Sequence, residues 1–433
     1  MGSIKIYPNK LNGKVKIPPS KSMAHRAVIC AALGDGISKI SNIDFSDDII
    51  ATIEAMRALG AIINNISEDS IEVKGINSKD ILSSREYERV IDCNESGSTL
   101  RFLVPIALAF EGVTRFVGKG NLGKRPLDTY YEMFDEQGIN YTYKEDVLDL
   151  VTSGLLKSGE FRVKGNISSQ FITGLMFSLP LLEGNSKIII TTELESKGYL
   201  DLTLSAIKDF GIEIVNNDYK EFVIRGNQKY KSQNYRVEGD YSQGAFFLSA
   251  DALGSDVKVV DLKEDSLQGD REVVDILSRM GASIAKGEDG FVAKGNELNS
   301  TLIDAAQCPD IIPVLALVAS LSKGRTEIIN AERLRIKECD RLKAVKLELN
   351  KLGAKICEKE DGLVIDGIDE LSGGIEVWSH KDHRIAMTLA IASTICKDPI
   401  IIKDYECVSK SYPHFFDDFK MLGGCFDEWN VGK

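Results

Sequence analysis

Nine consecutive residues, Arg333–Arg341, combine four cationic and two anionic side chains in the order Arg-Leu-Arg-Ile-Lys-Glu-Cys-Asp-Arg. Opposite charges this close together can hold one another's pKa values in place and still leave surplus positive charge for an anionic ligand. The simplest alternative is an exposed loop whose ion pairs contribute almost nothing to stability. Apolar residues at Leu342, Val345 and Leu349 predict an amphipathic helix directly after the segment. Short polar groups precede helices elsewhere along the chain as well, which favours ligand binding.

Composition limits the classes of partner. The 433 residues carry a net charge of −12 and 43% hydrophobic residues, as expected of a soluble globular protein with about two or three domains. The negative charge argues against nucleic acid or an anionic membrane as the main partner, so a small anionic substrate would need a local basic cluster. Eight cysteines without a Cys-x-x-Cys pair predict reduced thiols in a cytoplasm. The longest apolar stretches are too short to span a membrane.

An internal repeat organises the chain. A helix-ending glycine recurs at intervals of 78, 73, 70, 72 and 70 residues. Glycine suits the left-handed position that stops a helix, and the residues before each glycine follow helical spacing. Two short strand-like runs follow each of the first five of these glycines. The glycines are Gly60, Gly138, Gly211, Gly281, Gly353 and Gly423.

A second helix in each repeat is apolar nearly all round, which predicts burial on every side. The copies are residues 24–33, 99–110, 171–182, 245–253, 311–321 and 385–395. Each copy follows a short polar group whose Ser or Asp residues suit helix capping. Capping does not explain cations such as Lys21 and Arg384 there, because the helix dipole disfavours positive charge at an N-terminus. A bound anion would outweigh that cost.

The repeating unit is therefore a strand, a buried helix, a strand, an amphipathic helix and a hairpin. Six copies predict an α/β fold of two similar domains, each made of three βαβαββ repeats with buried helices inside and sheets outside. The polar stretch 228–233 lies near the midpoint and is a plausible crossover between the domains. We expect the helix N-termini of both domains to face a shared cleft.

Several familiar motifs receive little support. Residues 118–123 match the dinucleotide-binding fingerprint Gly-x-Gly-x-x-Gly, but none of the other repeats has these glycines. Pro126 interrupts the helix start that a dinucleotide site requires, and as a first helical residue it places Arg125 at a helix N-terminus. His383 could carry a proton or simply cap a helix. The chain has no histidine spacing typical of zinc sites, no nucleophile elbow and no P-loop.

The candidate ligand-binding side chains form three classes. Cations at predicted helix starts are Lys21, Arg26, Arg125, Lys337, Arg341, Arg384 and Lys410. Neutral donors accompany them at Ser22, Ser168, Ser169, Gln170, Ser196 and Tyr199, and acids at Asp310 and Glu338. Arginine binds phosphate and carboxylate bidentately, so this many cations imply more than one anionic group. An acid between cations is ionised and exchanges a proton only when a reaction brings one. The pattern predicts two phosphate- or carboxylate-bearing substrates in a cleft.

Four segments carry a resemblance to a known family: residues 20–26 (Ser-Lys-Ser-Met-Ala-His-Arg), 168–170 (Ser-Ser-Gln), 334–341 and 382–384 (Asp-His-Arg). In this order they resemble the signatures of the 5-enolpyruvylshikimate-3-phosphate (EPSP) synthase family, nearly end to end. The resemblance implies a two-domain, inside-out α/β fold in which the first strand returns to the C-terminal domain. The expected domains are then residues 1–19 with 238–433, and residues 20–237.

The resemblance also implies an activity. The enolpyruvyl group of phosphoenolpyruvate would pass to the 5-hydroxyl of shikimate 3-phosphate, and phosphate would leave through a tetrahedral intermediate. No metal or organic cofactor is expected, and we expect a cytoplasmic monomer with no nucleic-acid or membrane partner. Asp310 would take the hydroxyl proton, Glu338 would give a proton to the methylene carbon, and Lys21 would join them as a catalytic residue.

Site residues follow from the matching positions. Shikimate 3-phosphate would be held by Lys21, Ser22, Arg26, Ser168, Ser169, Gln170, Ser196, Tyr199, Asp310 and Lys337. Phosphoenolpyruvate would be held by Lys21, Gly97, Arg125, Gln170, Arg341, His383, Arg384 and Lys410. Because these residues come from both halves of the chain, we expect shikimate 3-phosphate to compact the protein. The sequence departs from the family pattern at Glu95, Ser98, Gly198 and Cys339.

Two rival interpretations remain. A sister enzyme, UDP-N-acetylglucosamine enolpyruvyl transferase, shares the fold, but its family pattern has a Lys-Asn pair near the first helix and a reactive Cys before Arg-Pro. Here Lys21-Ser22 and residues 121–124 (Asn-Leu-Gly-Lys) hold those places. A ring-shaped DNA clamp also has six repeated α/β units, but it needs basic residues spread along helices that face the duplex. This chain concentrates them at helix starts beside acids, which favours a small-molecule site.

Overall fold

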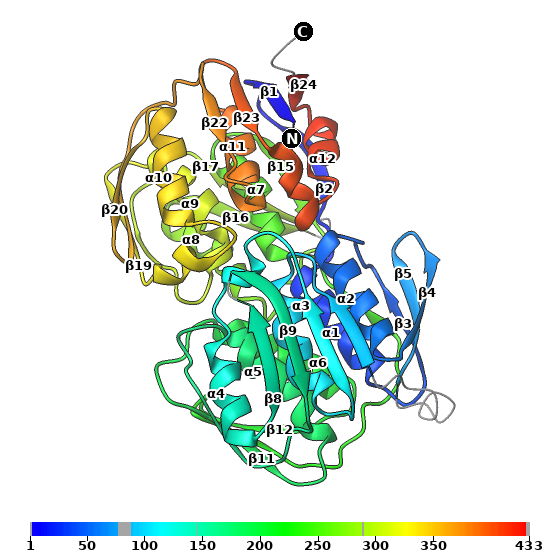
Figure 1. Cartoon of the computed structure of the whole chain (residues 1–433). Helices are drawn as coiled ribbons and strands as arrows, with labels where there is room; N and C mark the ends of the chain where they lie inside the picture. Colours follow the sequence, from blue (N-terminus) through cyan, green and yellow to red (C-terminus); the bar gives the residue numbers. More distant parts are fainter. Residues whose placement is uncertain (1, 77–87, 145, 288–289, 430–433) are drawn as a thin grey trace. The chain divides into compact units, whose positions relative to one another are not determined.

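The computed structural model describes residues 2–76, 88–144, 146–287 and 290–429 (Figure 1). The chain divides into two compact units. We call Met1–Pro18 with Gly239–Lys433 the C-terminal unit, and Pro19–Glu238 the N-terminal unit. Each unit has its own cluster of buried apolar residues.

The N-terminal unit contains three copies of the repeat. The first is α1 (Lys21–Ala32), β3 (Ile37–Ser41), α2 (Asp47–Ala58), β4 (Ile62–Ser67) and β5 (Ser70–Lys74). The second is β6 (Glu88–Asp92), α3 (Gly97–Ala107), β7 (Val113–Val117), α4 (Asp128–Gln137), β8 (Asn140–Lys144) and β9 (Val147–Ser153). The third is β10 (Glu160–Val163), α5 (Ser169–Ser178), β11 (Ser186–Ile190), α6 (Lys197–Asp209), β12 (Ile214–Asn217) and β13 (Glu221–Ile224), followed by β14 (Tyr235–Arg236).

The C-terminal unit repeats the same order after β1 (Ser3–Tyr7) and β2 (Asn12–Lys16). Its first copy is α7 (Tyr241–Ala252), β15 (Asp256–Val260), α8 (Glu272–Arg279), β16 (Ala282–Gly287) and β17 (Gly290–Gly295). The second is β18 (Leu302–Asp304), α9 (Ile312–Ser320), β19 (Arg325–Ile329), α10 (Arg341–Lys351), β20 (Lys355–Lys359) and β21 (Gly362–Asp366). The third is β22 (Glu376–Trp378), α11 (His383–Ser393), β23 (Ile400–Lys403), α12 (Phe415–Met421) and β24 (Cys425–Trp429).

The described residues form six four-stranded sheets, one for each repeat. In the sheet β6-β7-β9-β8, the first two strands are parallel and the remaining pairs antiparallel. Strands from elsewhere complete three of the sheets. β14 pairs with β3, β2 pairs with β15, and β1 lies between β23 and β24. The first two strands of the chain therefore join the sheets of the C-terminal unit.

The predicted buried helices are present as α1, α3, α5, α7, α9 and α11. Every residue of α7, α9 and α11 is buried. Strands bury alternate residues, such as Ile4 and Ile6 of β1, so one face of each sheet covers the helices. This arrangement confirms the predicted α/β fold with helices inside and sheets outside. Most buried helices begin two to four residues earlier than predicted, because the polar group forms the first helical turn instead of preceding it.

The recurring glycines end their helices as predicted. Each of the six has a positive φ, from 68° at Gly138 to 105° at Gly60 and Gly353. A side chain at these angles would be strained, which explains why the sequence period is so easily detected. A second marker was not predicted. The residue that follows the second strand of a repeat is left-handed at Asn42, Asp261, Asn330 and Asp404, residue types that tolerate this conformation.

The described residues of the N-terminal unit include two short 3-10 helices, η1 (Leu122–Lys124) and η2 (Leu179–Leu181). The C-terminal unit has η3 (Gly269–Arg271), η4 (Pro309–Ile311), η5 (Glu332–Ile336) and η6 (Tyr405–Lys410). These turns position several candidate site residues. In the part of the chain that the structure describes, every helix is too short or too polar to span a lipid bilayer.

Candidate active site

The repeat places many candidate residues at equivalent positions. Among the described buried helices, five begin at a cap whose side chain accepts a hydrogen bond from a helix backbone N–H: Ser20, Ser96, Ser168, Asp240 and Asp382. The first two helical residues then follow as the pairs Lys21-Ser22, Gly97-Ser98, Ser169-Gln170, Tyr241-Ser242 and His383-Arg384. At α9 the turn η4 replaces the cap and carries Asp310. The starts of the buried helices, which are equivalent in the repeats, therefore carry about half of the predicted site residues.

Two cations of α1 have partners within the N-terminal unit. Lys21 Nζ donates to Asp48 Oδ2 at 2.8 Å. Arg26 is buried, and its guanidinium donates to Thr203 Oγ1, to the Ser22 carbonyl and to the Tyr199 carbonyl at 2.7–2.9 Å. Burial lowers the pKa of Arg26 to about 10. Arg26 therefore fixes α1 against α6 and brings the predicted residues Ser22 and Tyr199 close together.

His25 lies between these cations in the sequence but has a structural environment. Its side chain is buried, and Nδ1 lies 2.7 Å from Thr52 Oγ1, which in turn lies 2.7 Å from Thr99 Oγ1. Burial lowers the pKa of His25 to about 3, although Asp48 acts in the opposite direction. A neutral imidazole thus links α1 to α2 and, through the threonines, to the start of α3.

Gln170, at the start of α5, is oriented by an arginine that the sequence analysis missed. Arg101 Nη1 donates to Gln170 Oε1 at 2.8 Å, and Gln170 Nε2 donates to Ser98 Oγ at 2.8 Å. Arginine has no acceptor, so it must face the amide oxygen and leave the NH2 group on the other side. Arg101 Nη2 also donates to the Pro126 carbonyl at 3.3 Å. A cation within the otherwise apolar helix 99–110 was the signal that could have identified it.

Gly97 allows a close approach at the start of α3. A Cβ atom at this position would lie 2.6 Å from Arg125 Nη1, closer than any real contact, and 3.7 Å from Gln170 Oε1. Gly97, Arg125 and Gln170 therefore lie together. Any larger residue at position 97 would displace the Arg125 guanidinium.

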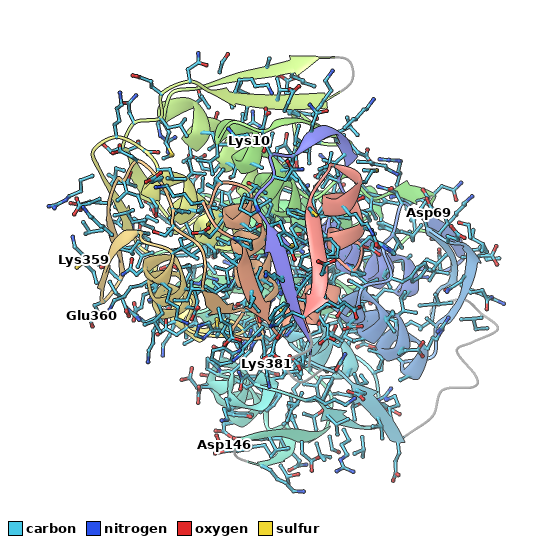
Figure 2. All side chains as sticks on the ribbon, turned by 90° about the horizontal axis from the view of Figure 1, so that it is seen from above. Lys10, Asp69, Asp146, Lys359, Glu360 and Lys381 are labelled. Atoms are coloured by element: carbon cyan, nitrogen blue, oxygen red, sulfur yellow. The ribbon has the colours of Figure 1, made fainter. Side chains whose placement is uncertain are left out.

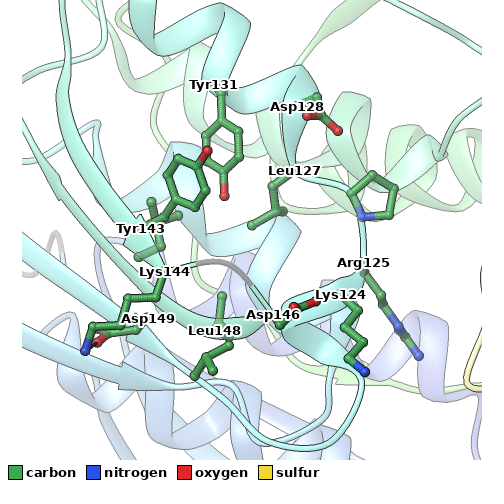
Figure 3. Close-up of a pocket in the computed structure, with 14 residues that line it drawn as sticks. Lys124, Arg125, Leu127, Asp128, Tyr131, Tyr143, Lys144, Asp146, Leu148 and Asp149 are labelled. Atoms are coloured by element: carbon green, nitrogen blue, oxygen red, sulfur yellow. Dashed lines mark ion pairs between the residues drawn. The ribbon is translucent and has the colours of Figure 1, made fainter.

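The turn that carries Arg125 borders a cavity of about 300 Å3 between η1 and the β8–β9 hairpin (Figure 3). On one side Tyr131 stacks on Tyr143, with ring centroids 4.7 Å apart. In Figure 3 the Arg125 guanidinium points away from this tyrosine pair. The cavity lining includes Lys124, Arg125 and Lys144 but also Asp128, Asp146 and Asp149. Because the charges balance, the cavity does not favour an anion.

The remaining predicted residues of the N-terminal unit lie at helix starts. Ser168 caps α5 and is half-buried, and Ser169 is buried in its first turn. Ser196 caps α6 with φ 56°, a conformation that non-glycine residues rarely adopt. Tyr199 follows in the first turn of α6, and its backbone N–H donates to the Ser196 carbonyl at 3.1 Å. Strain of this kind is common where a side chain must be aimed at a ligand.

In the C-terminal unit, the buried guanidinium of Arg341 holds several carboxylates. Nη1 donates to Asp310 Oδ1 at 2.7 Å, Nη2 to Glu338 Oε2 at 2.8 Å, and Nε to Asp382 Oδ2 at 2.8 Å. Burial alone would lower the pKa of Arg341, but these acids raise it well above its ordinary value. The two acids that could move protons are thus tied to one cation.

Asp310 lies among further cations. Lys337 Nζ is 3.5 Å from its Oδ1, and Arg384 Nη2 is 4.0 Å from its Oδ2. Burial would raise the pKa of Asp310, but the charges of Lys337, Arg341 and Arg384 hold it well below its ordinary range. Burial also lowers the pKa of Lys337. Asp310 is therefore ionised at neutral pH, which is the form that can accept a proton.

Arg384 is held by a serine that was also missed. Its Nη2 donates to Ser242 Oγ at 2.7 Å and its Nη1 to the Ser242 carbonyl at 2.9 Å. The Ser242 hydroxyl donates in turn to Asp240 Oδ1 at 2.5 Å. All three side chains are buried. Ser242 occupies the second helical position of α7, so its place in the repeat was the available signal.

Comparisons with known proteins identify the family of this chain. The model of the family described as EPSP synthase (3-phosphoshikimate 1-carboxyvinyltransferase) matches residues 6–419.

The chain belongs to the EPSP synthase family.

Relatives named 3-phosphoshikimate 1-carboxyvinyltransferase are similar over the whole length. Those of Clostridioides difficile and Clostridium beijerinckii are 72% and 71% identical, and each match covers 100% of both chains. The solved EPSP synthase of Acinetobacter baumannii shares the fold, with a TM-score of 0.83 at 24% identity over 99% of this chain and 100% of that one. The family predicted from the four motifs is therefore confirmed. Membership in the EPSP synthase family excludes the DNA clamp.

The secondary structure predicted around several of the cations was wrong. Arg125, Lys337 and Lys410 were expected at helix starts. Arg125 follows η1, and α4 begins at Asp128 rather than at Pro126. Lys337 follows η5, and Lys410 is the last residue of η6. Short 3-10 turns have no sequence period, so the analysis assigned these residues to the nearest amphipathic helix. Residues 118–123 likewise open no long helix, which removes the dinucleotide interpretation.

The charged segment Arg333–Arg341 contains both structural and candidate site residues. Arg335 donates to Glu358 and Asp340 and to the carbonyls of Lys359 and Glu360, so it holds η5 against β20. The Asp340 side chain caps α10 by accepting from the Lys343 N–H. Lys337 and Arg341 face Asp310 instead. His383 and Lys410 are buried at the start of α11 and the end of η6.

Proposed function

We propose that the protein transfers the enolpyruvyl group of phosphoenolpyruvate to the 5-hydroxyl of shikimate 3-phosphate and releases phosphate. The carrying observation is that Asp310 and Glu338 share the buried guanidinium of Arg341, with Lys337 and Arg384 beside Asp310. Two proton-transfer groups among several cations suit a reaction between two anionic molecules. The names of relatives more than 70% identical over the full length support the same activity.

In this proposal, shikimate 3-phosphate is bound mainly by the N-terminal unit. Lys21, Ser22 and Arg26 meet its phosphate or hydroxyl groups from α1. Hydroxyl and amide groups from the starts of α5 and α6 hydrogen-bond to the rest of the molecule. These groups are Ser168, Ser169, Gln170, Ser196 and Tyr199. Lys337 and Asp310 of the C-terminal unit complete the set.

Phosphoenolpyruvate carries a phosphate and a carboxylate, and arginine forks suit both. We assign Arg125, with Gly97, Gln170 and Lys21, to this substrate. From the C-terminal unit, Arg341, His383, Arg384 and Lys410 serve the same purpose.

The reaction then needs three proton transfers. Asp310 accepts the proton of the 5-hydroxyl while that oxygen bonds to the central carbon of phosphoenolpyruvate. Glu338 gives a proton to the methylene carbon, which becomes a methyl group in a tetrahedral intermediate. The methyl group then returns a proton to the Glu338 carboxylate, and the carbon–oxygen bond to phosphate breaks with its electron pair leaving on phosphate, which restores the enol ether. The cations, among them Lys21, offset the negative charge on the phosphate and carboxylate groups.

Phosphate release tests this function. Purified protein would receive phosphoenolpyruvate alone, with shikimate 3-phosphate, or with UDP-N-acetylglucosamine. We expect release only with shikimate 3-phosphate, and loss of release in Lys21→Ala although the variant remains folded. Release with the sugar alone would assign the chain to the sister activity, and no release with either would reject the proposal.

We also propose that residues 1–19 with 238–433 and residues 20–237 act as two domains of a cytoplasmic monomer. Shikimate 3-phosphate would then reduce the radius of gyration in solution scattering. Light scattering at several protein concentrations tests the monomer, and a mass near 95 kDa, about twice the 47.7 kDa of the chain, would contradict it.

A further inference from the structure

The turn before α11 holds an uncommon backbone conformation directly ahead of three residues of the active-site cluster. His380 and Lys381 have φ of 54° and 57°, so two consecutive non-glycine residues are left-handed. Such conformations persist only where the surroundings determine them strongly. Asp382 follows at once and accepts hydrogen bonds from Arg341 and from the Arg384 N–H. Lys381, which is labelled in Figure 2, is exposed, so burial of its side chain does not impose the turn.

The contact that holds the turn comes from Glu348 of α10. This carboxylate is buried, and Oε1 lies 2.9 Å from His380 Nε2. Its other oxygen accepts from the Trp378 N–H at 3.0 Å and from Lys351 Nζ at 2.7 Å. Burial would raise the pKa of Glu348, but these hydrogen bonds lower it below its ordinary value. Glu348 therefore binds the chain on both sides of Ser379.

The His380 ring is held on its other side as well. It packs against the Trp378 ring, with centroids 4.1 Å apart and ring planes tilted by 33°. Trp378 Nε1 donates to Asp404 Oδ2 at 2.9 Å, and the Ser379 hydroxyl donates to the Asp404 carbonyl at 3.1 Å. The turn is thus fixed between α10 and the residue that follows β23.

Arg341 and Glu348 are seven residues apart in α10, so two helical turns place them on one face. Arg341 binds Asp382 at the end of the turn, and Glu348 binds His380 at its start. One face of α10 therefore contacts the turn at both of its ends. Loss of the Glu348 contact would let the turn relax its strained φ angles and move Asp382.

We propose that Glu348 and His380 are positioning residues for the phosphoenolpyruvate cations. They hold residues 379–382 so that Asp382 orients the Arg341 guanidinium and caps α11 by accepting a hydrogen bond from the Arg384 N–H. The identity of the ligand rests on the proposed function, whereas the mechanical link between Glu348 and Asp382 does not.

Substitutions at neighbouring positions separate this role from general stability. His380→Gly suits the left-handed backbone but removes the ring, whereas Lys381→Gly relieves the same kind of strain and leaves Glu348 paired. His380→Gln keeps a donor of similar reach. We expect His380→Gly and Glu348→Gln to raise the KM for phosphoenolpyruvate roughly 10-fold, the usual effect of losing a buried charged hydrogen bond. The KM for shikimate 3-phosphate should stay within about twofold, Lys381→Gly should match wild type, and His380→Gln should recover most of the loss.

Hydrogen exchange of the peptide that covers residues 379–386 gives a readout without substrate. Exchange should be at least about fivefold faster in His380→Gly than in wild type, and near wild type in Lys381→Gly. Equal exchange and equal KM in His380→Gly and wild type would overturn the inference. So would a parallel rise of both KM values with a lower melting temperature. If wild type releases no phosphate at all, the function fails, and exchange alone decides this inference.

Discussion

The two units use the same repeated position in different ways. In the N-terminal unit, Ser98 accepts a hydrogen bond from the neutral amide of Gln170. In the C-terminal unit, Ser242 accepts from the charged guanidinium of Arg384, and Asp240 stands behind Ser242. Each hydroxyl orients a side chain from the second position of another buried helix. Where that side chain is a buried cation, the fold also supplies an acid.

The same contrast extends to the rest of each cluster. In the N-terminal unit, the predicted site residue Lys21 forms an ion pair with Asp48. In the C-terminal unit, Arg341 alone contacts Asp310, Glu338 and Asp382. Substitutions should therefore affect mainly ligand binding in the N-terminal unit, and both binding and folding in the C-terminal unit. Four predictions test this difference.

The largest effect is expected for Arg341→Met. Removing the cation leaves buried carboxylates without their partner, which typically costs roughly 3–5 kcal/mol. The free energy of unfolding from urea denaturation would measure it. Lys21→Met is the matched variant in the N-terminal unit, and its cost should be smaller because it removes one ion pair instead of three. Equal costs would remove the contrast between the units.

A pH dependence should come from His25 in the N-terminal unit. Its pKa of about 3 lies below the unfolded value of about 6.5, so the folded state resists protonation. The stability that this group contributes is present above pH 6.5 and is lost as the pH falls toward 3, by at most about 1.4 kcal/mol per pH unit. Urea denaturation at several pH values would show a shallower decline in His25→Gln. A parallel decline in both proteins would contradict the assignment.

The paired serines should differ in magnitude. Ser242→Ala removes a hydrogen bond to a charged group and should raise the KM for phosphoenolpyruvate roughly 10-fold. Ser98→Ala removes a neutral hydrogen bond and should raise it by about threefold. Ser242→Thr and Ser98→Thr keep the hydroxyl and serve as controls. A larger effect at Ser98 would reverse the comparison.

The smallest effect on the pH dependence of stability is expected from Asp310, because its carboxylate becomes protonated only under strongly acidic conditions. Its pKa is held well below the ordinary value, so its contribution to stability is present above about pH 3.8 and is lost as the pH falls through the folded value. The difference in stability between wild type and Asp310→Asn should therefore be constant from pH 7 to pH 5 and shrink below pH 4. A difference that already shrinks near pH 6 would mean that the pKa is not lowered.

Much of the fold followed from the sequence, because the period of about 70 residues is marked by glycines whose φ is positive. The buried helices were identified by apolar residues on all faces, and the polar groups before them identified the candidate site. Side chains that bind other side chains escaped detection. Arg101 and Ser242 contact Gln170 and Arg384 across about 70 and 140 residues of sequence, and no local pattern records such pairs. Turns such as η6 are too short to show a period, so Lys410 was misplaced.

The most direct test of the account is phosphate release by Asp310→Asn beside wild type, at saturating phosphoenolpyruvate and shikimate 3-phosphate. Asparagine keeps the shape of the side chain but cannot accept the hydroxyl proton. We predict that the turnover rate falls by roughly 100-fold to 10,000-fold, the usual range for a lost general base, while the protein remains folded. Turnover within tenfold of wild type in a folded variant would contradict the role of Asp310 and the proton transfer built on it.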